Sequence, residues 1–393
     1  MSPDKPGQGL HRTVYYAAPI HHVVVDMSLP LIDPEHYDEQ LAAKVQRLQA
    51  LLQPLGAPAA EVYPSPPLHY RMRAEFSLRR RPCGQLDYVM FEGPGRPVFQ
   101  PDFPAGSRRI NQLMAALRER FNDDPLLGDK LFQVGFLTTL SGEALVTLTY
   151  HRRLGEDWTE RAHRLEGELE AAVIGRSRKQ RVVLSRDHVT EQLTVQGTVW
   201  HQRQVEGGFT QPNAAVNQHM LNWAAGQAAR LSGDLLELYC GNGNFTLPLS
   251  RHFRRILATE ISKTSIEAAH HNLARNRVDN VALARLASAE VSQALAGVRR
   301  FQRLAQAGIE LSDYHFTTAL VDPPRAGLDD ETLALVKRFP QLLYISCNPE
   351  TMAANLRQLT DWRIERLALF DQFPYTHHIE CGVLLQHRSH PGR

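Results

Sequence analysis

The sequence predicts an α+β domain followed by a doubly wound α/β domain, and three observations support this prediction. The chain has 393 residues, which suits about two hydrophobic cores better than one. Between about residues 61 and 203, apolar and polar residues alternate as they do in the strands of a half-buried sheet. From about residue 208, apolar strands alternate with helical patterns, which is typical of a parallel sheet that binds ligands at the carboxyl ends of its strands.

The first half of the chain mixes helices with strands. Residues 36–52 carry leucine and valine at helical spacing, and Pro54 and Gly56 end this helix. Residues 1–26 show no periodicity, so we expect a disordered extension there. Further helices are expected at 105–121 and around 157–171, and strands at 75–81, 133–140, 143–150 and 181–185.

The second half alternates between apolar strands and helices. Helices are expected at 213–231, 262–276 and 330–339. Strands are expected at 234–239, 255–260, 317–322, 342–347, 366–371 and 382–387. We therefore divide the chain into domains at 27–205 and 206–393, with the segment 97–122 as a candidate for packing on the second domain.

Composition argues against several classes of protein. Lys and Arg total 44 and Asp and Glu total 42, so the net charge of +2 does not by itself indicate a nucleic-acid-binding protein. The four cysteines form no CxxC pair, which argues against a disulfide scaffold, a zinc site or an iron–sulfur cluster, and no metal is expected. The chain has neither a long apolar run nor the apolar core of a signal peptide, so we expect a cytoplasmic protein.

Basic residues cluster locally despite the low net charge. If the strand near residues 71–81 is unbroken, alternation places four arginines on one face: Arg71, Arg73, Arg79 and Arg81. A second cluster, RSRKQR, occupies residues 176–181. A basic stripe is typical of a surface that binds a phosphate backbone, although an ordinary solvated face gives the same pattern.

The segment LELYCGNGNFT (236–246) predicts a loop for a nucleotide-like cofactor. Gly241 and Gly243 follow a strand and precede a helix, which allows a tight turn and close approach of a ligand. Thr246 occupies the position of the third glycine of a dinucleotide fingerprint, which weakens the case for hydride transfer. Glu260 ends the next strand, where a carboxylate can bind both hydroxyls of a ribose. The loop suits S-adenosylmethionine as well as NAD, and a tight turn without any ligand is the remaining alternative.

Two later strands end in residues whose side chains could take part in a chemical reaction. Asp322 ends a strand and precedes Pro-Pro-Arg, which differs from the Asn/Asp-Pro-Pro-aromatic loop of enzymes that methylate amino groups. Cys347 ends another strand, so its thiol is expected in the crevice above the sheet. A buried structural cysteine is the alternative for Cys347 taken alone.

A thiol beside a methyl donor suits methylation at C5 of a pyrimidine. C5 is a poor nucleophile until a thiolate adds at C6, after which C5 can attack a sulfonium methyl group. A base must then remove the C5 proton so that the thiol can leave. The segment 370–386 offers four candidates for this base: Asp371, His377, His378 and Glu380. Glu380 precedes an apolar strand, where burial could raise its pKa towards the operating pH.

Taken together, these segments resemble the RNA 5-methyluridine methyltransferases, and most closely their tRNA branch. The resemblance covers about residues 27–387 and rests on five motifs in order: GGFTQPN, LELYCGNGNFT, LVDPPRAGLD, YISCNPET and HHIECGVLL. It implies a class I, Rossmann-like methyltransferase domain after an N-terminal α+β RNA-binding domain. The tRNA branch is favoured because the chain begins with a helix rather than a small β-barrel and has no cysteine cluster.

The resemblance also implies roles for particular residues. The family's nucleophile corresponds to Cys347 and its proton acceptor to Glu380. The family's S-adenosylmethionine pocket corresponds to five residues: Gln211, Tyr239, Asn244, Glu260 and Asp322. The implied reaction is C5-methylation of the T-loop uridine at position 54 of tRNA, with the tRNA-like loop of transfer-messenger RNA as a second substrate. No membrane or protein partner is implied.

Aromatic side chains are candidates for stacking on an RNA base that leaves its own stack. We favour Phe99 and Phe103, because the surrounding segment 94–106 is rich in Gly and Pro and is expected to be a loop that reaches across the domain junction. Other candidates are Phe76, Tyr88 and Phe91.

Three other functions remain as alternatives. The same chemistry could act on ribosomal RNA. The chain could also be a protein that binds or folds tRNA and whose catalysis is dispensable. An NAD-dependent oxidoreductase is disfavoured by Thr246 and by the context of Cys347. The glycine loop alone does not exclude a folate methyl donor, although the spacing of Glu260 disfavours it.

Overall fold

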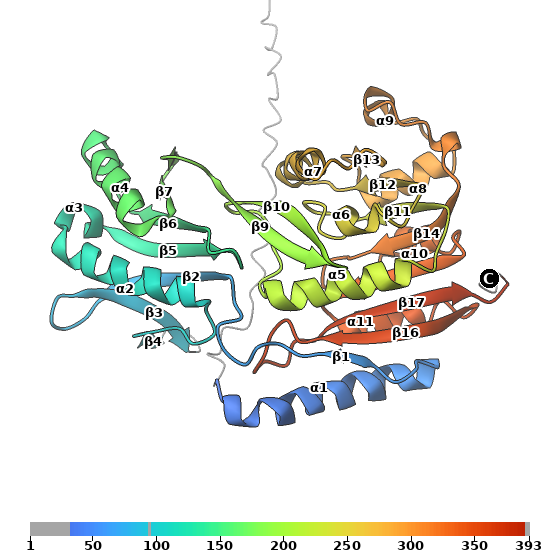
Figure 1. Ribbon diagram of the computed structural model, residues 1–393, viewed down its shortest axis with the longest axis horizontal. Coiled ribbons are helices and arrows are strands. Elements are labelled where there is room, and N and C mark those ends of the chain that lie inside the picture. Colours follow the sequence, from blue (N-terminus) through green and yellow to red (C-terminus); the bar gives the residue numbers. More distant parts are fainter. Residues whose placement is uncertain (1–31, 93–95, 390–393) are drawn as a thin grey trace, which may run out of the picture.

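Two lobes lie side by side in the computed structural model, which describes residues 32–92 and 96–389 (Figure 1). The larger, α/β lobe is built on an eight-stranded sheet, and the small lobe on a seven-stranded sheet. The expected extension at 1–26 lies outside the described residues. Within those residues, none of the helices has the length and apolar character needed to cross a membrane.

Five parallel strands form the centre of the α/β lobe, as the alternating pattern predicts. The order is β1-β16-β17-β15-β14-β11-β12-β13, and β17 runs antiparallel between β15 and β16. The strands span Glu61–Tyr63 (β1), Asp234–Leu238 (β11), Arg255–Thr259 (β12), Val281–Ala284 (β13), Phe316–Val321 (β14), Gln341–Ser346 (β15), Trp362–Phe370 (β16) and Glu380–His387 (β17).

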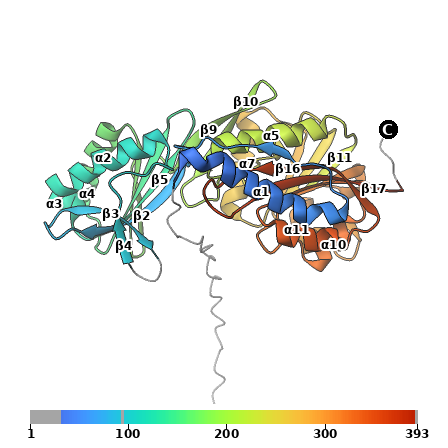
Figure 2. The ribbon, with the colours of Figure 1, turned by 90° about the horizontal axis from the view of Figure 1, so that it is seen from below.

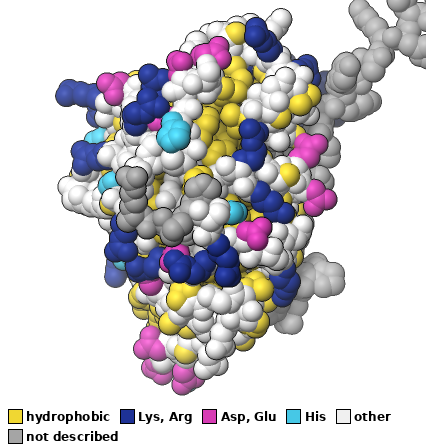
Figure 3. All heavy atoms as spheres, turned by 90° about the vertical axis from the view of Figure 1, so that its right-hand side faces the viewer, with side chains coloured by type: hydrophobic (Ala, Val, Ile, Leu, Met, Phe, Trp, Pro, Cys, Tyr) yellow, Lys and Arg dark blue, Asp and Glu magenta, His cyan; other side chains and the backbone are white. Residues whose placement is uncertain are grey.

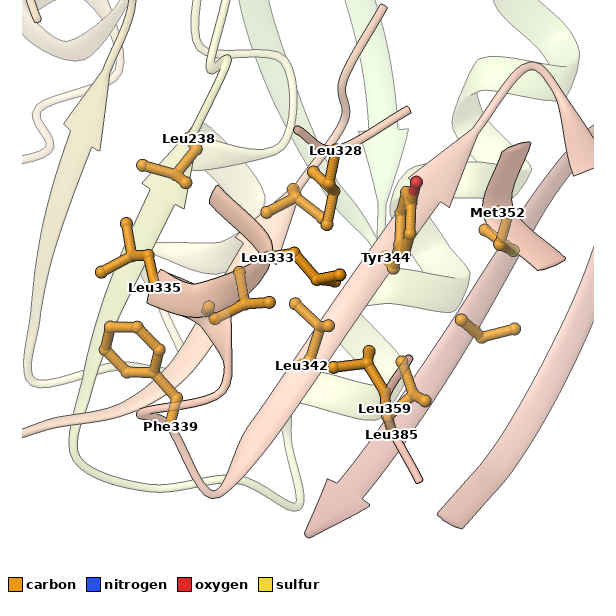
Figure 4. Packing of buried hydrophobic residues seen from close by; sticks show 14 of the residues in the cluster. Leu238, Leu328, Leu333, Leu335, Phe339, Leu342, Tyr344, Met352, Leu359 and Leu385 are labelled. Atoms are coloured by element: carbon orange, nitrogen blue, oxygen red, sulfur yellow. The ribbon is translucent and has the colours of Figure 1, made fainter. Parts of the chain in front are cut away.

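Helices cover both faces of this sheet. On one face lie α5 (Ala214–Ala228), α6 (Thr246–Leu249) and α7 (Lys263–Arg275). On the other lie α1 (Tyr37–Leu52), α8 (Ser288–Leu295), α9 (Gln302–Gln306), α10 (Asp330–Val336) and α11 (Pro349–Leu356). Short 3-10 turns span Pro34–His36, Gln53–Leu55 and Leu311–Asp313. Figure 4 shows Leu333 and Leu335 of α10 packed beside Leu342 of β15, and this apolar burial holds the layers together.

Helix α1 and strand β1 belong to the α/β lobe, which differs from the boundary expected at residue 205. The Leu48 and Leu52 side chains are fully buried in the core of the α/β lobe. Strand β1 pairs in parallel with β16 at the edge of the sheet. Figure 2 shows α1 lying across the α/β lobe rather than the small lobe. The leucine spacing correctly predicted the helix, but an apolar stripe does not specify which sheet it covers.

The small lobe is an antiparallel sheet with one parallel pair, covered by helices. The strand order is β4-β3-β2-β5-β6-β7-β8. The strands span Arg73–Arg80 (β2), Leu86–Glu92 (β3), Arg96–Phe99 (β4), Leu131–Thr138 (β5), Ala144–Tyr150 (β6), Ala172–Ser177 (β7) and Gln180–Val183 (β8). The helices span Arg108–Asp123 (α2), Pro125–Gly128 (α3) and Glu156–Leu169 (α4).

The segment 97–122 packs on its own lobe and not on the α/β lobe as we considered. In α2, Ile110, Leu113 and Leu117 are buried in one core with Phe76 of β2. The expected loop at 94–106 also contains an edge strand, because β4 pairs with β3. Pro97 is tolerated there because an edge strand leaves one side unpaired.

A long hairpin connects the two lobes. Strands β9 (His188–Val195) and β10 (Thr198–Val205) pair along their whole length. Leu193 and Trp200 are buried in the core under α5, whereas Val189 packs with Leu137 of the small lobe. Backbone hydrogen bonds form a second connection between the lobes. The Thr138 amide donates to the Met72 carbonyl, and the Met72 amide donates to the Pro212 carbonyl.

A buried ion pair fixes α1 to the loop after β16. Lys44 Nζ lies 2.6 Å from Asp371 Oδ1, and the two side chains are 6% and 0% exposed. The Tyr37 hydroxyl donates to the other oxygen of Asp371 at 2.9 Å. These bonds occupy the carboxylate, so Asp371, one of our four candidate bases, has a structural role instead.

Replacing Lys44 by methionine should destabilise the α/β lobe by about 3 kcal/mol, because it leaves the Asp371 carboxylate buried without its cation. Urea unfolding followed by tryptophan fluorescence measures this loss. The control is Lys263→Met, whose side chain is 74% exposed and whose ion pair with Glu267 is worth under about 0.5 kcal/mol. Equally small losses in both variants would contradict the anchoring role of Asp371.

Candidate active site

The candidate site lies at the carboxyl edge of the parallel sheet. Strands β11, β12, β14 and β15 end along this edge, and antiparallel β17 begins there. Ser346 at the end of β15 is paired with Cys381 of β17. One position further towards this edge, Cys347 follows Ser346 and Glu380 precedes Cys381, so the antiparallel register makes the predicted nucleophile and proton acceptor neighbours.

The Cys347 thiol is partly buried in a negatively charged setting. Burial is the main cause that raises its pKa to about 12, and the charges of Glu380 and Asp322 add to the shift, while exposed Arg325 opposes it. The backbone is fixed directly afterwards, because the Asn348 side chain caps α11 by accepting from the amides of its first turn. Cys347 therefore differs from the structural cysteines Cys240 and Cys381, which are completely enclosed.

Glu380 is the candidate base closest to this thiol in the sheet. Its side chain is buried, and burial together with the charge of Asp322 raises its pKa well above the usual range. His377 is exposed on the surface, where its backbone carbonyl accepts a bond from Arg47. His378 stacks edge-on against Phe373 in the loop. Neither imidazole occupies a strand end beside Cys347.

The glycine loop has the shape that the sequence predicts. Tyr239 adopts a left-handed backbone conformation (φ +61°) and its hydroxyl donates to Ser288 at 3.1 Å. Gly241 is also left-handed (φ +57°), and a Cβ placed there would meet open space, so a ligand can approach this backbone. The Glu260 carboxylate accepts bonds from the amides of Gly241 and Ser262, which fixes it beside the loop.

The remaining predicted cofactor residues lie around the start of α5. Asn244 exchanges amide hydrogen bonds with Asn217 of α5 at 2.9 and 3.0 Å. Gln211 lies two residues before Asn213, whose side chain caps α5 by accepting from the Val216 amide. The structure thus brings the Gly241 loop, Asn244 and the Gln211 loop to the same end of α5.

Glu237 is a candidate that our sequence reasoning missed. It lies on the central strand β11 with 1% exposure. Burial is the main cause that raises its pKa to about 8, and the charge of Asp322 adds to the shift, while contacts with the Thr246 hydroxyl and amide oppose it. Within the described chain no hydrogen bond to its carboxylate oxygens has the usual geometry, and a buried carboxylate held so weakly is costly, so its presence points to a ligand or a proton. The strand DLLELY carries two acids, Asp234 and Glu237, and the sequence pattern alone does not show that Glu237 is buried.

This donor set fits S-adenosylmethionine. The cofactor carries positive charge on its sulfonium and amino groups, and Glu237 and Asp322 provide carboxyl groups at the same edge, which a cationic ligand would favour in their ionised form. Glu260 beside Gly241 provides the carboxylate expected to bind ribose hydroxyls.

The candidate RNA-binding arginines do not form one free stripe. Arg73 and Arg79 share the outward face of β2, but Arg73 donates to the Gly208 carbonyl. Arg71 precedes the strand and donates to the Arg73 carbonyl. Arg81 follows it and pairs with Asp87. Arg79 is exposed, and it is the member of the four that the structure leaves most open to RNA.

The two favoured aromatic residues also differ from expectation. Phe103 is 7% exposed and packs edge-on against Phe76 in the core of the small lobe, so stacking on a base is not supported for it. Phe99 is partly buried, and the Arg81 guanidinium covers its ring at 4.4 Å. A segment rich in Gly and Pro predicts that its aromatic residues lie in a loop. It does not predict whether a neighbouring side chain covers the aromatic ring.

Comparison with known proteins identifies the family. A family model described as tRNA (Uracil-5-)-methyltransferase matches residues 36–388. The chain belongs to this family. A protein of Ectopseudomonas mendocina named tRNA/tmRNA (uracil-C(5))-methyltransferase is 56% identical over 366 residues, which cover 92% of this chain and all of the relative. A protein of Pseudomonas aeruginosa with the same name is 55% identical over the same shares of both chains.

A solved structure supports the fold independently of sequence. The structure of Pyrococcus abyssi tRNA (uracil-54, C5)-methyltransferase in complex with S-adenosyl-L-homocysteine has a TM-score of 0.69 to this chain. The two chains are 19% identical, and the match covers 92% of this chain and 86% of the other. The arrangement of both lobes is therefore shared across a wide sequence distance within these methyltransferases.

Because burial and two carboxylates raise the pKa of Cys347 to about 12, its thiolate should form only at high pH in the ligand-free protein. We expect iodoacetamide at pH 8 to modify Cys347 at least about tenfold more slowly than exposed Cys83, with a rate that still rises above pH 9. Peptide mass spectrometry measures both rates in one sample. Glu380→Gln should accelerate the reaction by removing one negative charge, and a plateau for Cys347 below pH 9 would contradict the raised pKa.

Proposed function

We propose that this chain transfers a methyl group from S-adenosylmethionine to C5 of the T-loop uridine at position 54 of tRNA. The tRNA-like loop of transfer-messenger RNA is a second substrate, and the cytoplasm is the compartment. The observation that carries the proposal is the adjacency of Cys347 and Glu380 at strand ends beside the Gly241 loop. The printed names of the relatives, which include both tRNA and tmRNA, support the choice of substrate.

The cofactor would be held between the glycine loop and the start of α5. Glu260 would bind the ribose hydroxyls, and Tyr239, Asn244 and Gln211 would contact the rest of the molecule. The carboxyl groups of Asp322 and Glu237 would offset its positive charge. When bound, S-adenosylmethionine supplies the methyl group that C5 acquires.

Cys347 activates the pyrimidine. Its thiolate sulfur forms a bond to C6, and the electron pair moves into the ring so that C5 becomes nucleophilic. In the ligand-free protein this thiolate is disfavoured by the neighbouring carboxylates. A cationic cofactor beside Asp322 would offset these carboxylates and would lower the pKa of the Cys347 thiol.

Glu380 completes the reaction as the proton acceptor. After C5 carries the methyl group, its remaining hydrogen leaves as a proton to the Glu380 carboxylate, and the C6–S bond breaks to regenerate Cys347. A raised pKa makes this carboxylate a stronger base, but it must be ionised to act. Activity therefore depends on deprotonated forms of both groups and rises with pH from the acid side.

Cys347→Ala should abolish methylation while tRNA binding persists, because the substitution removes the sulfur that bonds to C6 but leaves the small lobe intact. Transfer of labelled methyl groups to tRNA measures activity, and filter binding measures affinity. Cys83→Ala is the matched control, since Cys83 is an exposed thiol outside the site. Full turnover by the Cys347 variant would exclude it as nucleophile, and transfer to ribosomal RNA but not tRNA would reverse the choice of substrate.

Glu380→Gln should trap a covalent protein–RNA adduct, because the amide cannot accept the C5 proton that must leave before the C6–S bond breaks. A slowly migrating species on a denaturing gel detects the adduct. His377→Gln is the control and should turn over normally, since His377 is exposed and lies outside the strand-end cluster. An adduct with the His377 variant alone would assign the base to histidine.

A further inference from the structure

A groove with basic walls lies at the far end of the small-lobe sheet, away from the candidate active site. Its volume is about 670 Å³, and it is lined by the start of β5, the end of β6 and the turn between β7 and β8. Strand β5 reaches the α/β lobe at its other end, where Thr138 bonds Met72. Eight residues of strand, with a rise of about 3.3 Å per residue, therefore separate the groove from the lobe junction by roughly 25 Å.

Three cations of this groove have no acidic partner in the described chain. Arg153, Arg178 and Lys179 are exposed, and no carboxylate in residues 32–92 or 96–389 forms an ion pair with them. Other arginines of the same hairpin behave differently, because Arg176 and Arg181 both pair with Glu206. In the RSRKQR cluster, Arg176 and Arg181 therefore have a structural role, whereas Arg178 and Lys179 have no acidic partner within the described residues.

The walls of the groove are rigid. The Gln180 amide exchanges bonds with the backbone of Leu154, which ties the β7–β8 turn to the segment after β6. Lys179 itself adopts a left-handed conformation (φ +62°), where a side chain costs free energy that glycine would not. The Arg152 guanidinium donates to the Asp129 carbonyl. This arginine therefore holds the wall of the groove in place, and we do not count it among the cations that are available to a ligand.

A flat aromatic pair completes this surface. The Phe132 and His151 rings are stacked with centroids 3.8 Å apart and planes 10° apart, and both line the groove. On the face of the α/β lobe shown in Figure 3, by contrast, basic and acidic side chains are interspersed.

We propose that this groove, defined by Phe132, His151, Arg153, Arg178 and Lys179, binds the phosphate backbone of the RNA substrate away from the methylated base. Unpaired cations on a rigid concave surface suit a polyanion, and their separation from Cys347 makes them contacts that hold the RNA without taking part in the chemistry. This inference rests on the proposed function, because it assumes that the polyanion is RNA. Phosphate contacts do not read sequence, so the groove contributes affinity rather than choice of base.

The test is the triple variant Arg153→Ala/Arg178→Ala/Lys179→Ala in the full chain. The matched control is Arg230→Ala/Lys337→Ala/Arg357→Ala, which removes the same charge from exposed positions of the α/β lobe. We expect the groove variant to raise KM for tRNA at least about tenfold with kcat unchanged, and to lower the slope of log affinity against log salt by about two to three. The control should change KM less than about twofold.

Filter binding to an unrelated RNA hairpin separates this inference from the proposed function. The groove variant should lose affinity for that hairpin by the same factor as for tRNA, since phosphates are common to both. The groove assignment would be overturned if the groove variant lost no more affinity for RNA than the control variant does. A fall in kcat instead of a rise in KM would also overturn it. If the wild-type protein binds tRNA but does not methylate it, the proposed function fails, while the binding comparison still decides the groove.

Discussion

The burial of acidic groups at the carboxyl edge of the sheet is the constraint on which the site depends. Glu380 and Asp322 face the Cys347 thiol, and Glu237 on the central strand faces Asp322 in turn. Burial is the main cause that raises the pKa of each of these four groups, and repulsion from neighbouring carboxylates adds to it for Glu237, Glu380 and Cys347. Such a site disfavours the thiolate and suits a cationic cofactor, whose charge would lower the pKa of the thiol. Binding and activation are therefore expected to be linked through electrostatics.

The topology explains how these groups meet. Because β17 is antiparallel and inserted between β15 and β16, its first residue, Glu380, reaches the edge where β15 ends at Cys347. The loop that precedes Glu380 is held by Asp371, whose carboxylate bonds Lys44 and Tyr37 of α1. An N-terminal helix thus stabilises a C-terminal catalytic loop, which gives a physical reason for α1 to belong to the α/β lobe.

Local patterns in the sequence were enough to predict the strand ends and the glycine loop, because each is specified by neighbouring residues. Cys347 and Glu260 could be located in this way before the fold was known. Features that depend on distant partners could not be predicted. The leucines of α1 do not specify which of the two sheets the helix covers. Whether Arg81 is free to bind RNA depends on Asp87, which lies across a hairpin and pairs with it. Glu237 was overlooked because an acid in a strand gives no signal until its burial is known.

The distribution of charge explains how a nearly neutral chain can hold a polyanion. Glu206 forms ion pairs with Arg176 and Arg181, and these pairs join the β7–β8 hairpin to the end of β10. Cations that are paired in this way stabilise the lobe and are unavailable to RNA, whereas Arg178 and Lys179 on the same hairpin remain unpaired within the described residues. A whole-chain sum therefore counts structural and functional cations alike. Attraction by a few unpaired cations far from Cys347 can offset the cost of extracting a base, a few kcal/mol, without placing further charge in the catalytic site.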